Sequence, residues 1–473
     1  PSLFCFTAVS TQYWQAKKVA QYVSKIDESI FSVLGGHHAS LNSEEVINDG
    51  VFDAICIGEG EQAILDLVDS LSENGDLNSI TSLWVRDRKT GKVCKNPTGE
   101  FLGDLDSLPF MNRKVWDKWI VRPDEYPAIL LGRGCPFKCT YCASMVIHGS
   151  GIRTKSNQRI IDDLIYLRDE CGFSNIILWD DLLAARKTKF TALADRIVAE
   201  GVNKGLLFSM PSGLSVRIID DKLLESVCSL GFDYIRIMIE SGSVDAQHNI
   251  VKKKVDLDKA RHLIAHARTL GVKVETNILF GFPYETKRHM QETIDYIKTI
   301  DVDWIQVFSL LPLPGTEAFD QYAKMGKLDP NNIDWDRCGY SSREFDTKEV
   351  SAQELTDLVY DVNIYTNFFG NRNYLEGRYE RAANYFTDMV LWKYKFHIPA
   401  LYMRAQSYMQ LGDTDKATAD LGEAAMQIAT NEISRSHWQR YGSKMPMLMD
   451  YLDASYLDLY SPHPPSVDAG FIL

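Results

Sequence analysis

Residues 132–144 read GRGCPFKCTYCAS and bring three cysteines, Cys135, Cys139 and Cys142, into eight positions. An apolar run at 128–131 precedes them, so we expect the cysteines in a loop that follows a buried strand. Zinc sites usually complete four ligands, and no second cysteine pair lies nearby. An iron–sulfur cluster normally takes four thiolates, so three would leave one iron open to another ligand. The trio therefore indicates a catalytic cluster, with zinc and incidental thiols as the alternatives.

The sequence on both sides of this loop alternates between strand-sized apolar runs and amphipathic helices. Such an order is typical of a parallel β/α barrel, whose chemistry lies at the carboxyl ends of the strands. The cysteine loop follows the first strand, so it is expected on that rim. We predict a (β/α)6 partial TIM barrel over residues 126–340. Its expected strands are 128–134, 175–181, 205–212, 234–241, 274–282 and 304–312.

The first 75 residues show the same alternation, with strands that are apolar throughout. Such strands are buried on both faces, which predicts a partial doubly wound, Rossmann-like α/β domain over 1–75. The chain begins at Pro1 on a run that reads as an interior strand, so we expect this domain to be incomplete at its N-terminus. Residues 76–125 are predicted to be a linker that contains a hairpin.

The C-terminal part, residues 341–473, is predicted to be an α-helical domain. Residues 377–386 (GRYERAANYF) and 412–421 (GDTDKATADL) share Gly, Ala and a large apolar residue at an offset of 35. This spacing is typical of tetratricopeptide (TPR)-like helix pairs. Such helices predict either a cap on the barrel or a surface for docking another protein.

Composition limits the classes of partner. The net charge of −13 and the isoelectric point near 5.3 disfavour nucleic acid and anionic lipid as bulk partners. No apolar run reaches the length of a membrane-spanning helix. The nine cysteines include six scattered ones, which predicts free thiols in a reducing compartment and hence a cytoplasmic location.

The pattern C-x3-C-x-aromatic-C, with Tyr141 at the aromatic position, resembles the radical S-adenosylmethionine (SAM) superfamily over about 126–315. The resemblance implies a 4Fe-4S cluster on the three cysteines and S-adenosyl-L-methionine as its ligand. Sequence motifs match at successive strand ends: WDD at 179–181, IESGS at 239–243 and GIRTKS at 151–156. The family roles implied for them are contacts to the amino group, the ribose and the carboxylate of SAM. The cofactor-binding residues implied are Tyr141, Arg153, Ser156, Asp180, Asp181, Glu240 and Ser241.

The upstream domain resembles the cobalamin (B12)-binding domain of one subgroup of that superfamily. CFTAVSTQ at 5–12, LGGHH at 34–38 and IGEGE at 57–61 match the loops that receive the corrinoid, where Gly lets the backbone approach a large ligand. Tight βα turns are the alternative explanation of these glycines. No D-x-H-x-x-G motif for a lower-face cobalt ligand is present in the chain, so that ligand stays open. The resemblance implies cobalamin contacts from Thr7, Thr11, Gly35, Gly36, His37, Gly58 and Glu59.

The function implied by the resemblance is a cobalamin-dependent radical SAM methyltransferase. It would act on a small-molecule or peptide substrate and take electrons from a donor such as flavodoxin or ferredoxin. Two alternatives remain open: an oxidative cyclase or rearrangement enzyme without methyl transfer, and a non-catalytic corrinoid-binding docking protein. Side chains near the strand ends are candidates to line a substrate site, namely Trp179, Met210, Arg236, Met238, Asn277, Gln306 and Phe308.

Overall fold

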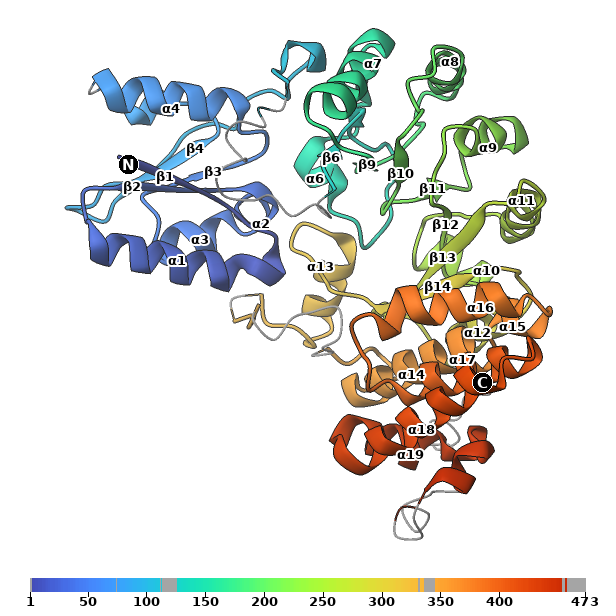
Figure 1. Ribbon diagram of the computed structural model, residues 1–473. Coiled ribbons are helices and arrows are strands. Elements are labelled where there is room, and N and C mark those ends of the chain that lie inside the picture. Colours follow the sequence, from blue (N-terminus) through green and yellow to red (C-terminus); the bar gives the residue numbers. More distant parts are fainter. Residues whose placement is uncertain are drawn as a thin grey trace.

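The computed structural model describes residues 2–73, 75–110, 112, 126–330, 332–335, 345–452 and 456. Three parts follow one another along the chain (Figure 1): an N-terminal α/β domain, a central barrel-like domain and a C-terminal group of helices. The predicted boundaries at 125/126 and 340/341 lie outside the described residues. Among the described residues, no helix has the length and apolar character needed to cross a membrane.

The N-terminal domain is one five-stranded sheet in the order β1-β2-β3-β4-β5. The first three strands are parallel and the last two are antiparallel, so the hairpin predicted in the linker 76–125 extends this sheet. Helix α4 covers one face of the sheet, and α1 and α3 lie on the other (Figure 1). The strands are β1 (Leu3–Thr7), β2 (Phe31–Gly35), β3 (Ala54–Cys56), β4 (Leu83–Arg86) and β5 (Val93–Lys95); the helices are α1 (Tyr13–Ile26), α3 (Ser43–Asn48) and α4 (Glu61–Glu73).

The stretch GGHH, predicted to be a loop, instead starts a short helix, α2 (Gly36–Leu41). Its His38 is fully buried, stacks on the ring of Tyr13 at 4.2 Å and has Nδ1 3.0 Å from the Ser10 hydroxyl oxygen. Burial costs a neutral imidazole much less than a charged one, because no charge is removed from water. These contacts hold the helix against the sheet, so His38 is a packing residue.

The central domain has a strand at each of the six predicted positions and one further short parallel strand, β11 (Leu214–Ser215); all seven are parallel to their neighbours. They form two sheets, β6-β9-β10 and β11-β12-β13-β14, which an isolated bridge between Phe208 and Phe232 joins. No pairing closes β14 onto β6 within the described ranges, so these strands form an open barrel. The bounds are β6 (Ala128–Ile129), β9 (Asn175–Leu178), β10 (Leu207–Ser209), β11 (Leu214–Ser215), β12 (Tyr234–Glu240), β13 (Lys273–Phe280) and β14 (Trp304–Ser309).

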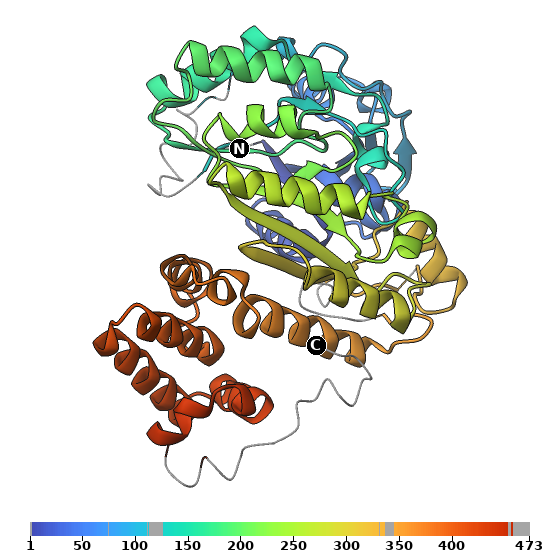
Figure 2. The same ribbon diagram turned by 90° about the vertical axis from the view of Figure 1, so that its right-hand side faces the viewer.

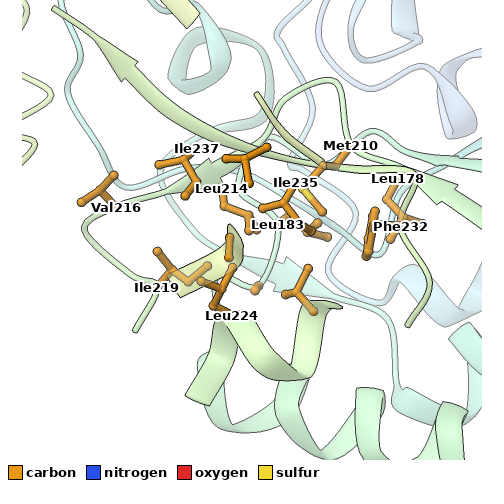
Figure 3. Close-up of a cluster of buried hydrophobic side chains, with 14 of the residues drawn as sticks. Leu178, Leu183, Met210, Leu214, Val216, Ile219, Leu224, Phe232, Ile235 and Ile237 are labelled. Carbon is orange, nitrogen blue, oxygen red and sulfur yellow. The ribbon is translucent and has the colours of Figure 1, made fainter. Parts of the chain in front are cut away.

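Amphipathic helices cover the outside of these strands, and several start at side-chain caps. Asp220 and Asp256 accept backbone N–H groups at the starts of α9 and α11, and Thr286 forms a capping box at α12. The apolar faces of helices and strands meet in one core, part of which Figure 3 shows around Leu178, Met210 and Ile235. The helices are α7 (Asn157–Ile165), α8 (Lys187–Ala199), α9 (Asp221–Cys228), α11 (Leu257–Thr269) and α12 (Lys287–Ile297).

The C-terminal helices divide into two groups. Helix α14 (Ala352–Ile364) packs beside β14, and its Leu355, Leu358 and Val362 belong to the barrel core. The following helices share a second core, which also includes Trp304 of β14, and α16 pairs with the barrel through Arg381 and Asp303. The last helices of the chain lie farthest from the barrel strands (Figure 2). The helices after α14 are α15 (Arg372–Leu375), α16 (Tyr379–Phe386), α17 (Ile398–Gln410), α18 (Thr414–Thr430) and α19 (Glu432–Tyr441).

Candidate active site

A cavity of about 800 Å³ lies where the carboxyl ends of the barrel strands face the N-terminal domain. Cys135, Cys139 and Cys142 all line it. The N-terminal domain contributes the segment 9–11, His37 and Leu41 to the opposite wall. The cysteine loop therefore lies on the rim of the barrel, as predicted. It faces a cavity between the barrel and the N-terminal domain.

Glycine and a carboxylate shape the start of the cysteine loop. Gly134 has a φ of +91°, and a Cβ there would lie 2.2 Å from the carbonyl oxygen of Gly151, so only glycine fits. Its N–H donates to Asp181 Oδ2 at 2.9 Å. Just before it, β7 (Gly132–Arg133) pairs antiparallel with β8 (Arg153–Thr154). The loop is thus anchored before Cys135 begins it.

The three thiols fit an iron–sulfur cluster by their chemistry. They are the soft ligands that such clusters take, and they share one cavity. Burial raises the pKa of the Cys135 thiol and raises that of Cys139 to about 12, so positive charge from a metal is needed to hold them as thiolates. Within the described residues, no group of three His, Cys, Asp or Glu side chains is close enough to hold a single metal ion.

Glu240 is the centre of a buried polar network beside the thiols. Its Oε1 accepts from Tyr141 Oη at 2.9 Å and from Lys253 Nζ at 2.8 Å, and its Oε2 accepts from Asn277. Glu240 has a φ of +69° at an irregularity in the β12–β13 pairing. A non-glycine residue in this region costs free energy and tends to occur where function fixes a side chain. The bulge turns the carboxylate into the cavity.

Lys253 comes from a loop whose backbone is also constrained. Lys252 and Lys254 on either side have φ values of +54° and +56°. The residues 251, 253 and 255 are buried, while the two flanking lysines point outward. Lys253 is the only Lys or Arg among the described residues that line the cavity. The loop therefore delivers one cation to a site that otherwise holds carboxylates and thiols.

The predicted acidic pair after β9 splits between two places. Asp181 lines the cavity and accepts His148 Nδ1 at 2.7 Å; burial opposes its ionisation, but these bonds outweigh that effect and hold the pKa of Asp181 below its usual value. Asp180 is not in the cavity wall, because its carboxylate accepts the N–H groups of Leu131 and Gly132. Burial raises the pKa of Asp180 to about 7. Only Asp181 is in reach of a cavity ligand.

Three other residues predicted around SAM have partners elsewhere. Arg153 forms a bidentate ion pair with Glu59 of the N-terminal domain, with Nη2 2.7 Å from Oε1 and Nη1 2.9 Å from Oε2. Ser156 caps α7, where its side chain accepts the N–H of Arg159. Ser241 is fully buried, with its hydroxyl oxygen 3.1 Å from that of Thr293. None of the three lines the cavity.

Of the seven residues predicted to meet a corrinoid, the cavity wall includes two, Thr11 and His37. A Cβ on Gly36 would lie 2.4 Å from the Thr7 hydroxyl oxygen, so that pair is packed internally. The others lie outside the wall: Thr7, Gly35, Gly36, Gly58 and Glu59. Four of the seven candidate substrate residues do line the cavity, namely Trp179, Met238, Asn277 and Phe308. The remaining three do not: Met210, Arg236 and Gln306.

Two cavity residues, Lys253 and His148, were absent from the predicted set. The sequence does contain a signal for Lys253, because Val-Lys-Lys-Lys-Val alternates with a period of two and its centre shares a face with the two valines. His148 is the imidazole nearest to the cysteines in sequence, but only the fold brings it to Asp181. It also lies against His37 of the N-terminal domain, with ring centroids 6.2 Å apart.

Residues 129–297 match the model of the radical SAM superfamily, which confirms the resemblance read from the cysteine loop. Residues 129–297 therefore form a radical SAM domain, which contains the loop, Glu240 and Lys253.

Relatives extend the similarity beyond that domain. An uncharacterized methyltransferase of Pyrococcus horikoshii is 27% identical over 76% of this chain and 77% of its own length. Cytidylyl-2-hydroxyethylphosphonate methyltransferase of Streptomyces wedmorensis is 26% identical over 63% of this chain and 62% of its own length. Both similarities cover more of the chain than the radical SAM domain alone.

Solved structures share the architecture. The cobalamin-dependent S-adenosylmethionine radical enzyme OxsB, with aqua-cobalamin and SAM bound, aligns with a TM-score of 0.63 at 14% identity. The alignment covers 97% of this chain and 70% of that one. The methyltransferase TsrM from Kitasatospora setae aligns with a TM-score of 0.59 at 15% identity, over 69% of this chain and 65% of that one. At these identities the likeness is one of fold.

Proposed function

We propose that this enzyme is a cobalamin-dependent radical SAM methyltransferase that alkylates a small-molecule substrate. One observation carries the proposal: the three thiols, the Glu240–Lys253 pair and the loops of the N-terminal domain all border one cavity. The named methyltransferase activities of the two relatives and the cobalamin in OxsB support it.

The cofactors would supply the difficult chemistry: an electron from the 4Fe-4S cluster to cleave SAM, and a methyl group from the corrinoid. The chain's own residues bind, orient and exclude water. Cys135, Cys139 and Cys142 would hold the cluster. No fourth cysteine lies among the described residues of the wall, so one iron of a bound cluster would be left open to the amino and carboxylate groups of SAM.

Charges in the wall match those groups. The Lys253 ammonium suits the carboxylate of SAM, because it is the one Lys or Arg found in the described wall. The carboxylates of Glu240 and Asp181 suit the ribose hydroxyls and the amino group. Tyr141 and Asn277 fix the orientation of Glu240, which prepares the site before the ligand arrives.

The opposite wall would meet the corrinoid. Val9, Ser10, Thr11 and Leu41 are small or apolar, and His37 adds one polar ring. Burial lowers the pKa of His37, with His148 as a second cause, so the imidazole stays neutral near pH 7. A neutral wall of this kind suits a large, flat ligand that lies between the two domains.

The C-terminal helices fit the proposed TPR-like assignment. Gly377 and Gly412, the first residues of the two repeats, have φ values of +75° and +79° and lie just before α16 and α18. Ala382 and Ala417, five residues further on in each copy, are both fully buried. We propose that this unit docks a partner protein, because α14 and α16 cover β14, whereas α18 and α19 lie farther from the strands (Figure 1).

One relative favours the cyclase alternative. The anaerobic magnesium-protoporphyrin IX monomethyl ester cyclase of Rubrivivax gelatinosus is 22% identical over 80% of this chain and 67% of its own length. The two activities differ in the fate of SAM, because only methylation of the corrinoid converts SAM to S-adenosylhomocysteine.

The test needs no knowledge of the substrate. The anaerobically reconstituted enzyme is mixed with SAM, hydroxocobalamin and a strong reductant, and the products are resolved by chromatography. We expect both methylcobalamin and S-adenosylhomocysteine, together with slow release of 5′-deoxyadenosine. The Cys5→Ser variant, at an exposed cysteine outside the cavity, is the matched control. Release of 5′-deoxyadenosine without the other two products would contradict methyl transfer and favour the cyclase.

A further inference from the structure

Glu59 was predicted to contact the corrinoid, yet its carboxylate points at the barrel. It accepts Arg153 Nη1 and Nη2 at 2.9 and 2.7 Å, and Arg133 Nη1 lies 3.1 Å from Oε1. The Leu102 N–H completes its bonding at 2.8 Å. Only 7% of the Glu59 side chain is exposed. All of these contacts reach residues outside the loop after β3, so Glu59 joins the two domains.

The two arginines are neighbours in the structure that holds the cysteine loop. Arg133 and Arg153 are paired residues of the β7–β8 ladder, and Arg133 lies two positions before Cys135. Two guanidinium groups on facing positions repel each other unless anions lie between them. Glu59 contacts both, and Glu61 adds a second carboxylate 2.6 Å from Arg133 Nη2. The N-terminal domain therefore supplies the counter-charge for this ladder.

The surroundings of Arg153 tighten the same link. Its Nη1 also donates to Leu102 O at 2.8 Å and its Nη2 to His148 O at 3.1 Å, and its guanidinium lies 5.0 Å from the ring centroid of Phe101. His148 in turn bonds to Asp181, which accepts the N–H of Gly134. A continuous set of contacts thus runs from Glu59 to the residue before Cys135.

We propose that Glu59 is a positioning residue for the cluster loop and not a ligand-contacting residue of the corrinoid site. It holds Arg133 and Arg153 together, and through the β7–β8 ladder it fixes the place of Cys135 relative to the N-terminal domain. Hydrogen bonds and both arginines outweigh the effect of burial and keep the pKa of Glu59 below its usual value, so the carboxylate is charged near pH 7.

The experiment compares two measurements on the full-length, anaerobically reconstituted enzyme. One is the rate of iron release to an excess of bathophenanthroline, and the other is the affinity for hydroxocobalamin. Glu59→Gln is expected to release iron about tenfold faster, as loss of a supporting contact typically weakens a metal site by about that factor. Its affinity for hydroxocobalamin is expected to stay within about twofold of wild type, because Glu59 does not line the cavity.

A second variant separates positioning from a general loss of packing. Glu59→Gln/Arg153→Gln removes one of the two facing guanidinium groups, so it is expected to release iron more slowly than Glu59→Gln alone. Glu44→Gln is the matched control, since Glu44 also pairs with a cation in the same domain but is mostly exposed. If Glu59→Gln fails to fold, Glu59→Asp keeps the charge with a shorter reach, and its iron release should lie between wild type and the tenfold change.

Three outcomes overturn the proposal: iron release by the Glu59 variants that matches wild type, no rescue in the double variant, or a tenfold loss of hydroxocobalamin affinity with the cluster unaffected. The inference draws on the proposed function only for the corrinoid measurement. If wild-type enzyme binds no hydroxocobalamin, the proposed function fails, whereas the iron-release comparison still decides the role of Glu59.

Discussion

The barrel mouth, where the strand ends and the cysteine loop border the cavity, and the loops of the N-terminal domain carry sequence motifs of the same kind, yet the structure uses them differently. At the mouth, Tyr141, Asp181 and Glu240 join the cysteines around one cavity. In the N-terminal domain, only Thr11 and His37 of the seven predicted residues reach it. Side chains at the ends of parallel strands converge by geometry, whereas a residue in a βα turn can serve the ligand, the turn or a neighbouring domain.

The largest effect expected at the mouth comes from the cysteines. Cys139→Ser removes one of three thiolates, and loss of a direct ligand should cost at least the roughly 100-fold that loss of a supporting contact can cost a metal site. Iron and sulfide content and methylcobalamin formation measure it. Cys5→Ser, in the exposed edge strand β1, should keep both at the wild-type level. A Cys139→Ser enzyme with full iron content would mean that the mouth does not hold the cluster through this trio.

Local sequence patterns predict the strands of the barrel, but they do not predict which distant side chains meet in the site. Six of the barrel strands and the rim position of the loop follow from local apolar patterns, and the structure has a strand at all six positions; the short β11 is the one that was not predicted. The bond between Tyr141 and Glu240 joins residues 99 positions apart, and the pair of Arg153 and Glu59 joins residues 94 apart. No local pattern encodes such partners. Without them, Arg153 fits the SAM carboxylate as well as it fits Glu59, and only the three-dimensional placement decides.

The second test sets a buried ion pair of the mouth against an exposed one next to it. Lys253 and Glu240 are 8% and 3% exposed, whereas Lys252 and Glu317 are 40% and 42% exposed. Glu240→Gln leaves a buried ammonium without its anion, so the free energy of unfolding should fall by about 3 kcal/mol. Glu317→Gln should change it by less than about 1 kcal/mol. Denaturant titration measures both. Equal losses of unfolding free energy would show that the buried pair of Glu240 and Lys253 contributes no more to stability than the exposed pair.

The last expected effect belongs to the N-terminal domain and is spread over a range of pH. Burial lowers the pKa of His38 from 6.5 to about 4, and its Nε2 is buried without a partner among the described residues. The unfolded chain therefore binds a proton in this range that the folded chain does not. Stability contributed by neutral His38 is complete above pH 6.5 and is lost as pH falls toward 4, at a slope of at most about 1.4 kcal/mol per pH unit.

His38→Gln removes this titration while keeping a polar side chain near Ser10. The variant is expected to be less stable than wild type at pH 7, but its stability should fall less than that of wild type between pH 6.5 and pH 4. His262→Gln, at an exposed histidine of the barrel, should leave the wild-type slope in place. Unfolding of the N-terminal domain is followed by hydrogen exchange of β2 and β3, which report on this domain alone. Parallel curves for His38→Gln and wild type would mean that folding does not change the pKa of the His38 imidazole. His38 would then be in contact with water in the folded domain, and the contrast between this packing residue and the cavity-lining residues of the barrel would be weaker.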